Sequence, residues 1–143
     1  MGLFALTLAG MFAGAALYIS YVEHPARLTL DDRALLRQFK PSYKRGYVMQ
    51  ASLAVLSGMA AILSFARDRH PAWIVGAVLI LANWPYTMFR ILPLNNQLMA
   101  VPENAADAHS TEMLWRWGRL HAVRTGLGLG ATAMFLWALW SFR

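Results

Sequence analysis

The sequence contains no cysteine among its 143 residues. This absence excludes disulfides, thiolate metal sites and disulfide exchange with quinones, and it removes one class of small four-helix membrane enzymes. It does not assign the protein to a cellular compartment.

Charged residues are also scarce. They make up 14% of the chain, against about 25% in an average soluble domain, while 58% of the residues are hydrophobic. We therefore expect that water is not the main solvent around the protein's surface.

Four apolar stretches explain this composition, at residues 2–22, 46–66, 72–92 and 120–140. Each is close to the roughly 20 residues that a helix needs to cross a bilayer. We therefore predict one all-α domain over residues 1–143, an integral-membrane four-helix bundle. The first stretch has no basic region before it, so we expect a retained span rather than a cleaved signal peptide.

The connection between the first two spans begins with Pro25, which does not continue a helix interior. Thr29 then suits the cap of a new helix, because an aspartate pair follows in what would be its first turn. The apolar residues that come next share one face: Leu35, Leu36 and Phe39. We predict a short helix lying along the membrane interface between spans one and two.

Basic residues outnumber acidic ones by 13 to 7, which gives a net charge of +6. They lie in the short connections between spans, so membrane topology explains them and we expect no nucleic-acid partner. The positive-inside rule predicts that loops 23–45 and 93–119 are cytoplasmic. We expect a multi-pass protein, in the bacterial inner membrane. The same arginines also suit the binding of an anionic ligand.

Glycines recur at four-residue spacing in two places, Gly10 with Gly14 and Gly126 with Gly130. In a membrane this pattern lets two helix backbones approach closely. We predict that both pairs pack helices together, within the bundle or in a homo-oligomer.

Polar residues gather where the spans end on the arginine-rich side. Residues three or four apart share a helix face, so Trp117, His121 and Arg124 lie on one face of the fourth span. The other spans bring comparable sets: Tyr21, Glu23 and His24; Tyr43, Tyr47 and Gln50; and Tyr86, Arg90, Asn95 and Asn96. Because polar groups at membrane depth usually face a bundle interior, we predict a shared pocket at this end.

Ordinary structural roles remain open for these side chains. Arg90 can extend to the lipid headgroups, and Trp117 can belong to an interfacial aromatic belt. Asn95 can shape a turn, and His24 can bond a terminal carbonyl of its own helix. His121 is the residue that such roles explain least well.

A metal site is an alternative to a purely organic pocket. His24, His121 and Glu23 form a donor set that iron, copper or zinc accepts. No short spacing places these ligands together on one helix, and haem between the two histidines is a further alternative. We expect no cofactor.

The segments "VEHPARL", "ILPLNNQL" and "WGRLHAVRTG" resemble the small integral-membrane family that includes the fungal anthrone oxygenases and many uncharacterised bacterial proteins. The resemblance covers nearly the whole chain, including its four-span layout. It implies oxidation of an anthrone to an anthraquinone by dioxygen, a monooxygenase reaction without an identified organic cofactor. The family's motif positions fall on Asn95, Trp117, His121 and Arg124.

This resemblance implies roles for the predicted pocket. Removing a proton from the activated methylene gives a delocalised anion that reduces dioxygen, so the protein supplies a base and groups that hold an oxyanion. His121 is the expected base, with His24 as the alternative, and Arg124, Arg90 and Asn95 stabilise the negative charge. The residues expected to bind the substrate are Trp117, Tyr86, Arg90, Tyr47 and Gln50. The expected partners are membrane lipid, a hydrophobic small molecule and dioxygen.

Other functional classes compete with this one. A non-catalytic membrane protein that binds a lipid or a small anionic hydrophobic ligand, or a subunit of a larger complex, fits the excess of arginine equally well. A membrane glutathione-type transferase is disfavoured because residues 46–66 contain no arginine or acid. A transporter is disfavoured because no acid lies near the middle of any span.

Overall fold

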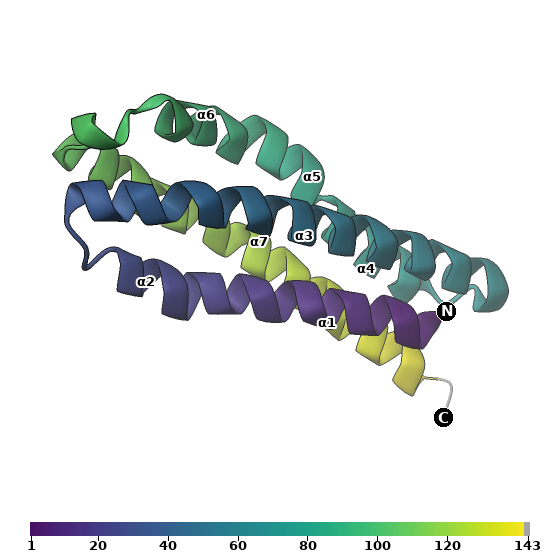
Figure 1. The fold of residues 1–143 in the computed structure, drawn as a ribbon. Coiled ribbons are helices and arrows are strands. Elements are labelled where there is room, and N and C mark those ends of the chain that lie inside the picture. Colours follow the sequence, from purple (N-terminus) through teal and green to yellow (C-terminus); the bar gives the residue numbers. More distant parts are fainter. Residues whose placement is uncertain (142–143) are drawn as a thin grey trace.

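The computed structural model describes residues 1–141, and this part of the chain is helical without strands. Four continuous helical segments run the length of the molecule (Figure 1), and each is long and apolar enough to cross a membrane. The protein is therefore an all-α, multi-pass membrane protein, as the composition predicts. The segments are Gly2–Arg27, Asp32–Asp68, Pro71–Ala100 and Ala108–Trp140.

Two of these segments are built from several pieces. The first consists of α1 (Gly2–Tyr18), the π-helical turn η1 (Ile19–Glu23) and α2 (His24–Arg27). The third consists of α4 (Pro71–Leu81), α5 (Asn83–Tyr86), the π-helical turn η2 (Thr87–Ile91) and α6 (Leu92–Ala100). The second is the single helix α3 (Asp32–Asp68) and the fourth the single helix α7 (Ala108–Trp140). A 3₁₀ turn, η3 (Glu103–Ala105), precedes α7.

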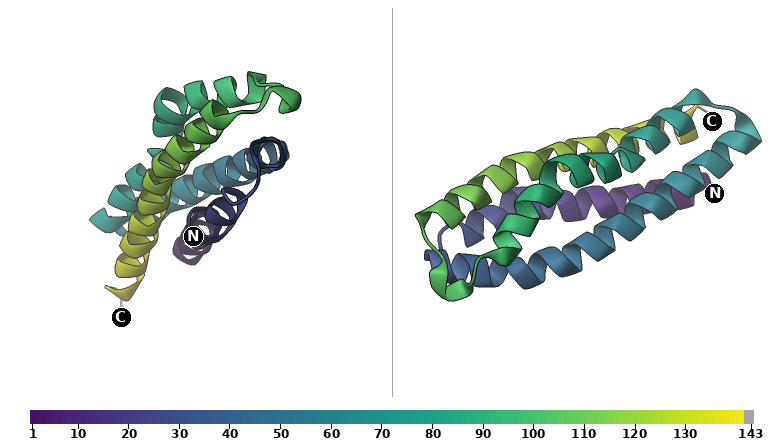
Figure 2. Two further views of the ribbon diagram at one scale, coloured as in Figure 1. Left: turned by 90° about the vertical axis from the view of Figure 1, so that its left-hand side faces the viewer. Right: turned by 90° about the horizontal axis from the view of Figure 1, so that it is seen from above.

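The helices form a bundle in which α1 and α4 each pack against both α3 and α7. The start of α1 and the end of α7 lie at one end of the bundle, as Figures 1 and 2 show. The connections before α3 and before α7 lie at the opposite end. The polar span ends that the sequence places together therefore do share one end of the molecule.

The core consists of two hydrophobic clusters. The cluster nearer the chain ends is built around Phe12, Trp73 and Phe135. The other cluster, nearer the connections, is built around Phe39 and Trp117. Three segments carry buried polar residues at the level between the clusters: Gln50, Asn83, Thr87, His121 and Arg124.

Both π-helical turns precede a proline by two residues. Pro25 follows η1 and Pro93 follows η2. A proline has no N–H for the carbonyl four residues earlier, and its ring presses on that carbonyl, so a widened turn relieves the contact. These turns change the phase of the side chains that follow them.

The region predicted to be a separate interfacial helix is instead the first part of α3, which continues through Pro41 into the second span. Its cap is Asp31, whose side chain accepts a hydrogen bond from the Ala34 amide at 3.0 Å. Thr29 is not the cap, because its hydroxyl donates to the Ala26 carbonyl at 2.8 Å. The residues ahead of Pro41 stay helical because their apolar face, Leu35, Leu36 and Phe39, is fully buried.

The predicted packing role of the paired glycines within the bundle is wrong for three of the four. Gly10, Gly14 and Gly126 face open space, and only Gly130 of the four comes close to another helix, at Leu79. Close packing occurs at other glycines: Gly58 against Leu81, Gly76 against Phe135 and Gly128 against Phe12. A four-residue spacing shows that two residues share a face, but it does not tell which way that face points.

Candidate functional site

Two adjoining pockets lie at the polar level between the hydrophobic clusters, and both are lined by Tyr47, Gln50 and Arg124. The His121 pocket also includes Asn95, Trp117 and His121, and it holds about 380 Å³ with its open mouth included. The Thr87 pocket also includes Ala51, Asn83, Trp84 and Thr87, and it holds about 390 Å³ on the same measure.

His121 is positioned by hydrogen bonds to its neighbours in the first and fourth segments. Its Nδ1 lies 3.1 Å from the Ser20 hydroxyl, which lies 2.9 Å from the Thr125 hydroxyl. Thr125 donates to the Ala16 carbonyl at 3.2 Å. Because a carbonyl only accepts, we assign Ser20 as donor to Thr125 and Nδ1 of His121 as donor to Ser20.

This tautomer leaves Nε2 of His121 as the ring's acceptor. Within residues 1–141, Nε2 has no hydrogen-bond partner, although the ring is only 1% exposed. The ring stacks on Trp117, with centroids 4.9 Å apart and planes inclined by 21°. A buried imidazole with one nitrogen held and the other available has the arrangement of a general base.

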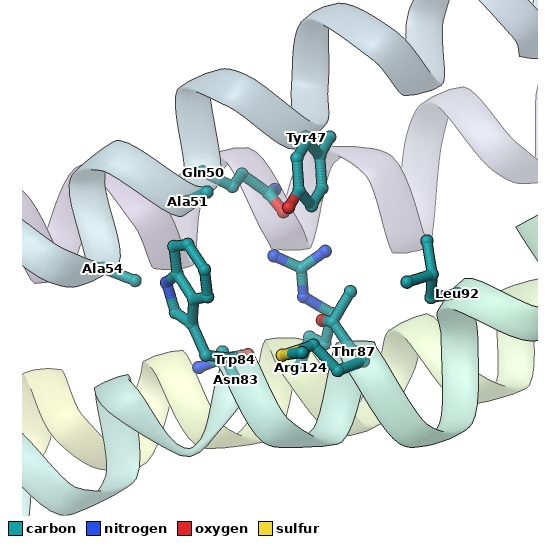
Figure 3. A pocket seen from close by; sticks show the side chains of 10 residues that line it. Tyr47, Gln50, Ala51, Ala54, Asn83, Trp84, Thr87, Leu92 and Arg124 are labelled. Carbon is teal, nitrogen blue, oxygen red and sulfur yellow. The ribbon is translucent and has the colours of Figure 1, made fainter.

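Arg124 is a buried cation without a carboxylate partner. It is 8% exposed, and the ion pair found in the described part of the chain joins Arg27 to Glu23 instead. The guanidinium carbon lies 5.6 Å from the centroid of the Phe12 ring. Figure 3 shows the guanidinium projecting from α7 toward Tyr47 and Gln50 of α3. A buried charge is normally paired, so Arg124 is suited to meet an anionic ligand group.

Asn95 fixes the orientation of Trp117. Its side-chain oxygen accepts a hydrogen bond from the indole N–H at 2.8 Å, and the residue is fully buried. Its amide nitrogen has no partner within the described chain. Asn95 therefore sets one wall of the His121 pocket and still offers a donor.

His24 lies against Trp117 but does not line either pocket. The two ring centroids are 5.1 Å apart, and Nε2 of His24 donates to the Leu114 carbonyl at 3.0 Å. This contact joins the end of the first segment to α7. The arrangement favours His121 over His24 as the base.

Gly118 provides the space in which the His24 ring packs. A Cβ at this position would lie 2.6 Å from both Cδ2 and Nε2 of His24. We expect Gly118→Ala to displace the ring and to destabilise the protein by about 1–3 kcal/mol, the usual cost of overpacking. Thermal unfolding in detergent measures this effect.

Gly126→Ala, on the same helix, is the matched control. Gly126 faces open space, so its replacement is expected to be neutral or stabilising, by up to about 1 kcal/mol, because alanine favours helix. Equal unfolding midpoints for the two variants would contradict the close packing of His24 on Gly118.

Several residues expected at the pocket lie elsewhere. Tyr86 donates its hydroxyl to the Leu120 carbonyl at 3.0 Å, and Arg90 is exposed on η2. Neither lines the two pockets. Tyr21 is 76% exposed, and Asn96 is exposed as well.

The alternative of a metal site has little support in the geometry. Over residues 1–141, no three histidine or acidic side chains cluster closely enough to hold a metal ion. The Glu23 carboxylate accepts hydrogen bonds from Ser42 at 2.6 Å and Gln38 at 3.1 Å and pairs with Arg27. Trp117 contacts both imidazoles.

Four polar residues of this region are not among those predicted from the sequence, namely Asn83 and Thr87 in the Thr87 pocket and Ser20 and Thr125 beside His121. Asn83 and Thr87 are four residues apart inside an otherwise apolar span, which is a signal that the sequence does contain. Ser20 and Thr125 are small hydroxyl residues of a kind that is common in membrane helices, so their spacing alone does not distinguish them.

Comparisons of this chain with a family profile and with curated proteins give the same family. A profile of the anthrone oxygenase family matches residues 39–134. "Anthrone oxygenase tpcL" of Aspergillus fumigatus is 30% identical over 131 residues, which covers 85% of this chain and 81% of that protein. "Anthrone oxygenase" of Claviceps purpurea is 26% identical over 142 residues, covering 87% and 80%. "Anthrone oxygenase ptaC" of Pestalotiopsis fici is 30% identical over 109 residues, covering 66% and 77%. No solved structure matches the chain.

Proposed function

Because this chain belongs to the anthrone oxygenase family, we propose that it oxidises a hydrophobic polyphenolic compound, such as a hydroxylated anthrone, with dioxygen. The methylene of the substrate becomes a carbonyl, so that an anthrone becomes an anthraquinone. One oxygen atom of dioxygen enters the product, and the other leaves as water with the two methylene hydrogens. The atoms therefore balance without any further reductant.

The first step is removal of a proton from the methylene by Nε2 of His121. The electron pair left on carbon spreads through the ring system to the opposite carbonyl oxygen, which becomes an oxyanion. Arg124, which is buried, stabilises this charge by electrostatic attraction. The resulting electron-rich ring reacts directly with dioxygen, and loss of water from the peroxide formed at the ring carbon gives the quinone.

The observation that carries this proposal is the unpaired, buried Arg124 beside a histidine with a free acceptor nitrogen. In an anthrone the carbonyl and the methylene lie on opposite edges of the central ring. Arg124 lines both pockets and His121 lines one, so a single flat ligand across both pockets meets the cation and the base at different edges. Trp117 lines the His121 pocket as well, and its indole holds the His121 ring by stacking on it.

The protein supplies a base and a cation for this chemistry, so we propose that it needs neither a metal nor an organic cofactor. Dialysis of the purified protein against a chelator is expected to leave the rate unchanged. A loss of rate that is restored by one metal ion would instead support a metal-dependent oxidation.

Oxygen uptake tests the proposed function. The purified protein in lipid vesicles is expected to consume one dioxygen per quinone formed from 1,8-dihydroxyanthrone, well above the rate of vesicles alone. Heat-denatured protein is the control. Binding of the compound without oxygen uptake would favour the alternative function, a membrane protein that binds a small anionic hydrophobic ligand.

A further inference from the structure

The Thr87 pocket contains an unusual set of polar atoms. Within the described chain, four of them have no hydrogen-bond partner: Gln50 Nε2, Asn83 Oδ1, Thr87 Oγ1 and Arg124 Nε. Their residues are between 1% and 8% exposed. Buried polar atoms nearly always have a partner in native proteins, so four unpartnered atoms around one hollow indicate a polar ligand.

Local structure explains why the Asn83 oxygen is available. The amide nitrogen of Asn83 donates to the Ile80 carbonyl at 3.0 Å, in the turn that precedes Pro85. The nitrogen thus serves the helix, and the oxygen remains as an acceptor beside the pocket.

The four atoms differ in their hydrogen-bonding chemistry. Gln50 Nε2 and Arg124 Nε only donate, Asn83 Oδ1 only accepts, and the Thr87 hydroxyl does both. A complementary ligand edge therefore has one oxygen that accepts, and carries negative charge in its ionised form, beside a hydroxyl that donates. A phenol next to a ring carbonyl has this pattern, whereas a ring without hydroxyls does not.

The remaining surroundings suit the flat face of such a ligand. Ala51 and Ala54 of α3 line one side, and Trp84 and Met88 line the other, as Figure 3 shows for the labelled residues. Trp84 is 40% exposed and Met88 is 54% exposed, so this side reaches the outer surface of the bundle. An aromatic ligand can therefore lie between apolar walls with its oxygenated edge inward.

We propose that the Thr87 pocket is a recognition subsite for the oxygenated edge of the substrate, a ring hydroxyl next to the carbonyl. The ring hydroxyl donates to the Asn83 oxygen and accepts from the Thr87 hydroxyl, and the carbonyl oxygen accepts from Gln50 and Arg124. The assignment rests on the proposed function for what happens next at His121, but binding at this subsite does not require turnover.

Thr87→Val tests the subsite, because it replaces a hydroxyl by a methyl group of similar size. Since the hydroxyl has no partner in the described chain, the fold loses no hydrogen bond. The probes are 1,8-dihydroxyanthraquinone and unsubstituted anthraquinone, which are already oxidised, and binding is measured by quenching of tryptophan fluorescence. We expect Thr87→Val to weaken binding of the dihydroxy probe about five- to tenfold, the effect of one hydrogen bond, and to leave the unsubstituted probe unchanged.

Thr132→Val is the matched control, because Thr132 lies on α7 away from both pockets and donates to the Gly128 carbonyl at 2.9 Å. It is expected to bind both probes as the unchanged protein does. Gln50→Leu, a second variant at the subsite, is also expected to weaken binding of the dihydroxy probe and not of the unsubstituted probe. Equal affinity of Thr87→Val and the unchanged protein for the dihydroxy probe, or an equal loss for both probes, would overturn the subsite.

The two proposals fail in different ways. If the protein binds the dihydroxy probe through Thr87 but consumes no oxygen, the subsite is supported and the proposed function is wrong. If the protein oxidises 1,8-dihydroxyanthrone and Thr87→Val has the same KM as the unchanged protein, the proposed function is supported and the subsite is wrong.

Discussion

Replacement of His121 by glutamine is expected to lower kcat for oxidation of 1,8-dihydroxyanthrone about 100-fold or more, the usual contribution of a general base. Glutamine keeps a polar group near Ser20, but it does not accept a proton at neutral pH. The rate of quinone formation, followed by its visible absorbance, measures the effect. Binding of the oxidised dihydroxy probe is expected to change little, because the proton transfer belongs to the reaction rather than to binding.

His109→Gln is the matched control for this variant, since His109 lies exposed in the first turn of the same helix, α7. It is expected to retain full activity. If His121→Gln turned the substrate over as fast as His109→Gln, His121 would not be the base, and His24 would become the residue to test.

Replacement of Arg124 by glutamine is expected to lower the rate about as much as His121→Gln does, without destabilising the fold. Loss of one group that stabilises an oxyanion lowers kcat about 100-fold. The free energy of unfolding is expected to stay the same or to rise, because Arg124 is a buried charge without a carboxylate partner. Quinone formation and thermal unfolding, measured on the same preparation, test both effects.

Arg119→Gln, at an exposed position of the same helix, serves as the control and is expected to change neither quantity. Arg124→Lys keeps the positive charge but loses the planar guanidinium. Its activity is therefore expected to lie between that of the unchanged protein and that of Arg124→Gln. A marked loss of stability in Arg124→Gln, with activity lowered only in proportion to the unfolded fraction, would indicate a structural arginine.

The sequence predicts the architecture well, because hydropathy and span length depend on local composition. The four spans, the absence of strands in the described part of the chain and the shared polar end follow from it. Within α7, the spacing of Trp117, His121 and Arg124 predicts a common face, and all three are buried. This inference holds because α7 is a regular helix over its whole length.

The prediction that Tyr86 and Arg90 share a face of the pocket depends on a regular helix that the third segment does not have. The π-helical turn η2 begins directly after Tyr86 and contains Arg90. A π-helical turn has more residues than an α-helical one, so residues four apart no longer point the same way. Pro93, which causes this turn, is visible in the sequence, but the number of residues in the widened turn cannot be predicted from it.

Rotation of a helix about its own axis is the other quantity that spacing does not determine. Gly126 and Gly130 share a face of α7 in the way their spacing predicts, but the helix turns Gly128 toward Phe12 and leaves Gly126 facing outward. The side chains of the neighbouring helices decide this rotation through packing. For the same reason, the role of Asn83 and Thr87 in the pocket becomes visible only when α3 and the third segment are placed together.

Deuterium exchange without oxygen tests the central claim, proton removal by His121, most directly. Under anaerobic conditions in D₂O, the unchanged protein is expected to exchange the methylene hydrogens of 1,8-dihydroxyanthrone faster than buffer and empty vesicles do, as followed by NMR. His121→Gln is expected to lose about 100-fold of this exchange, because the base is gone while the pocket remains. No exchange above the background rate with the unchanged protein, or equal exchange by His121→Gln, would contradict the account.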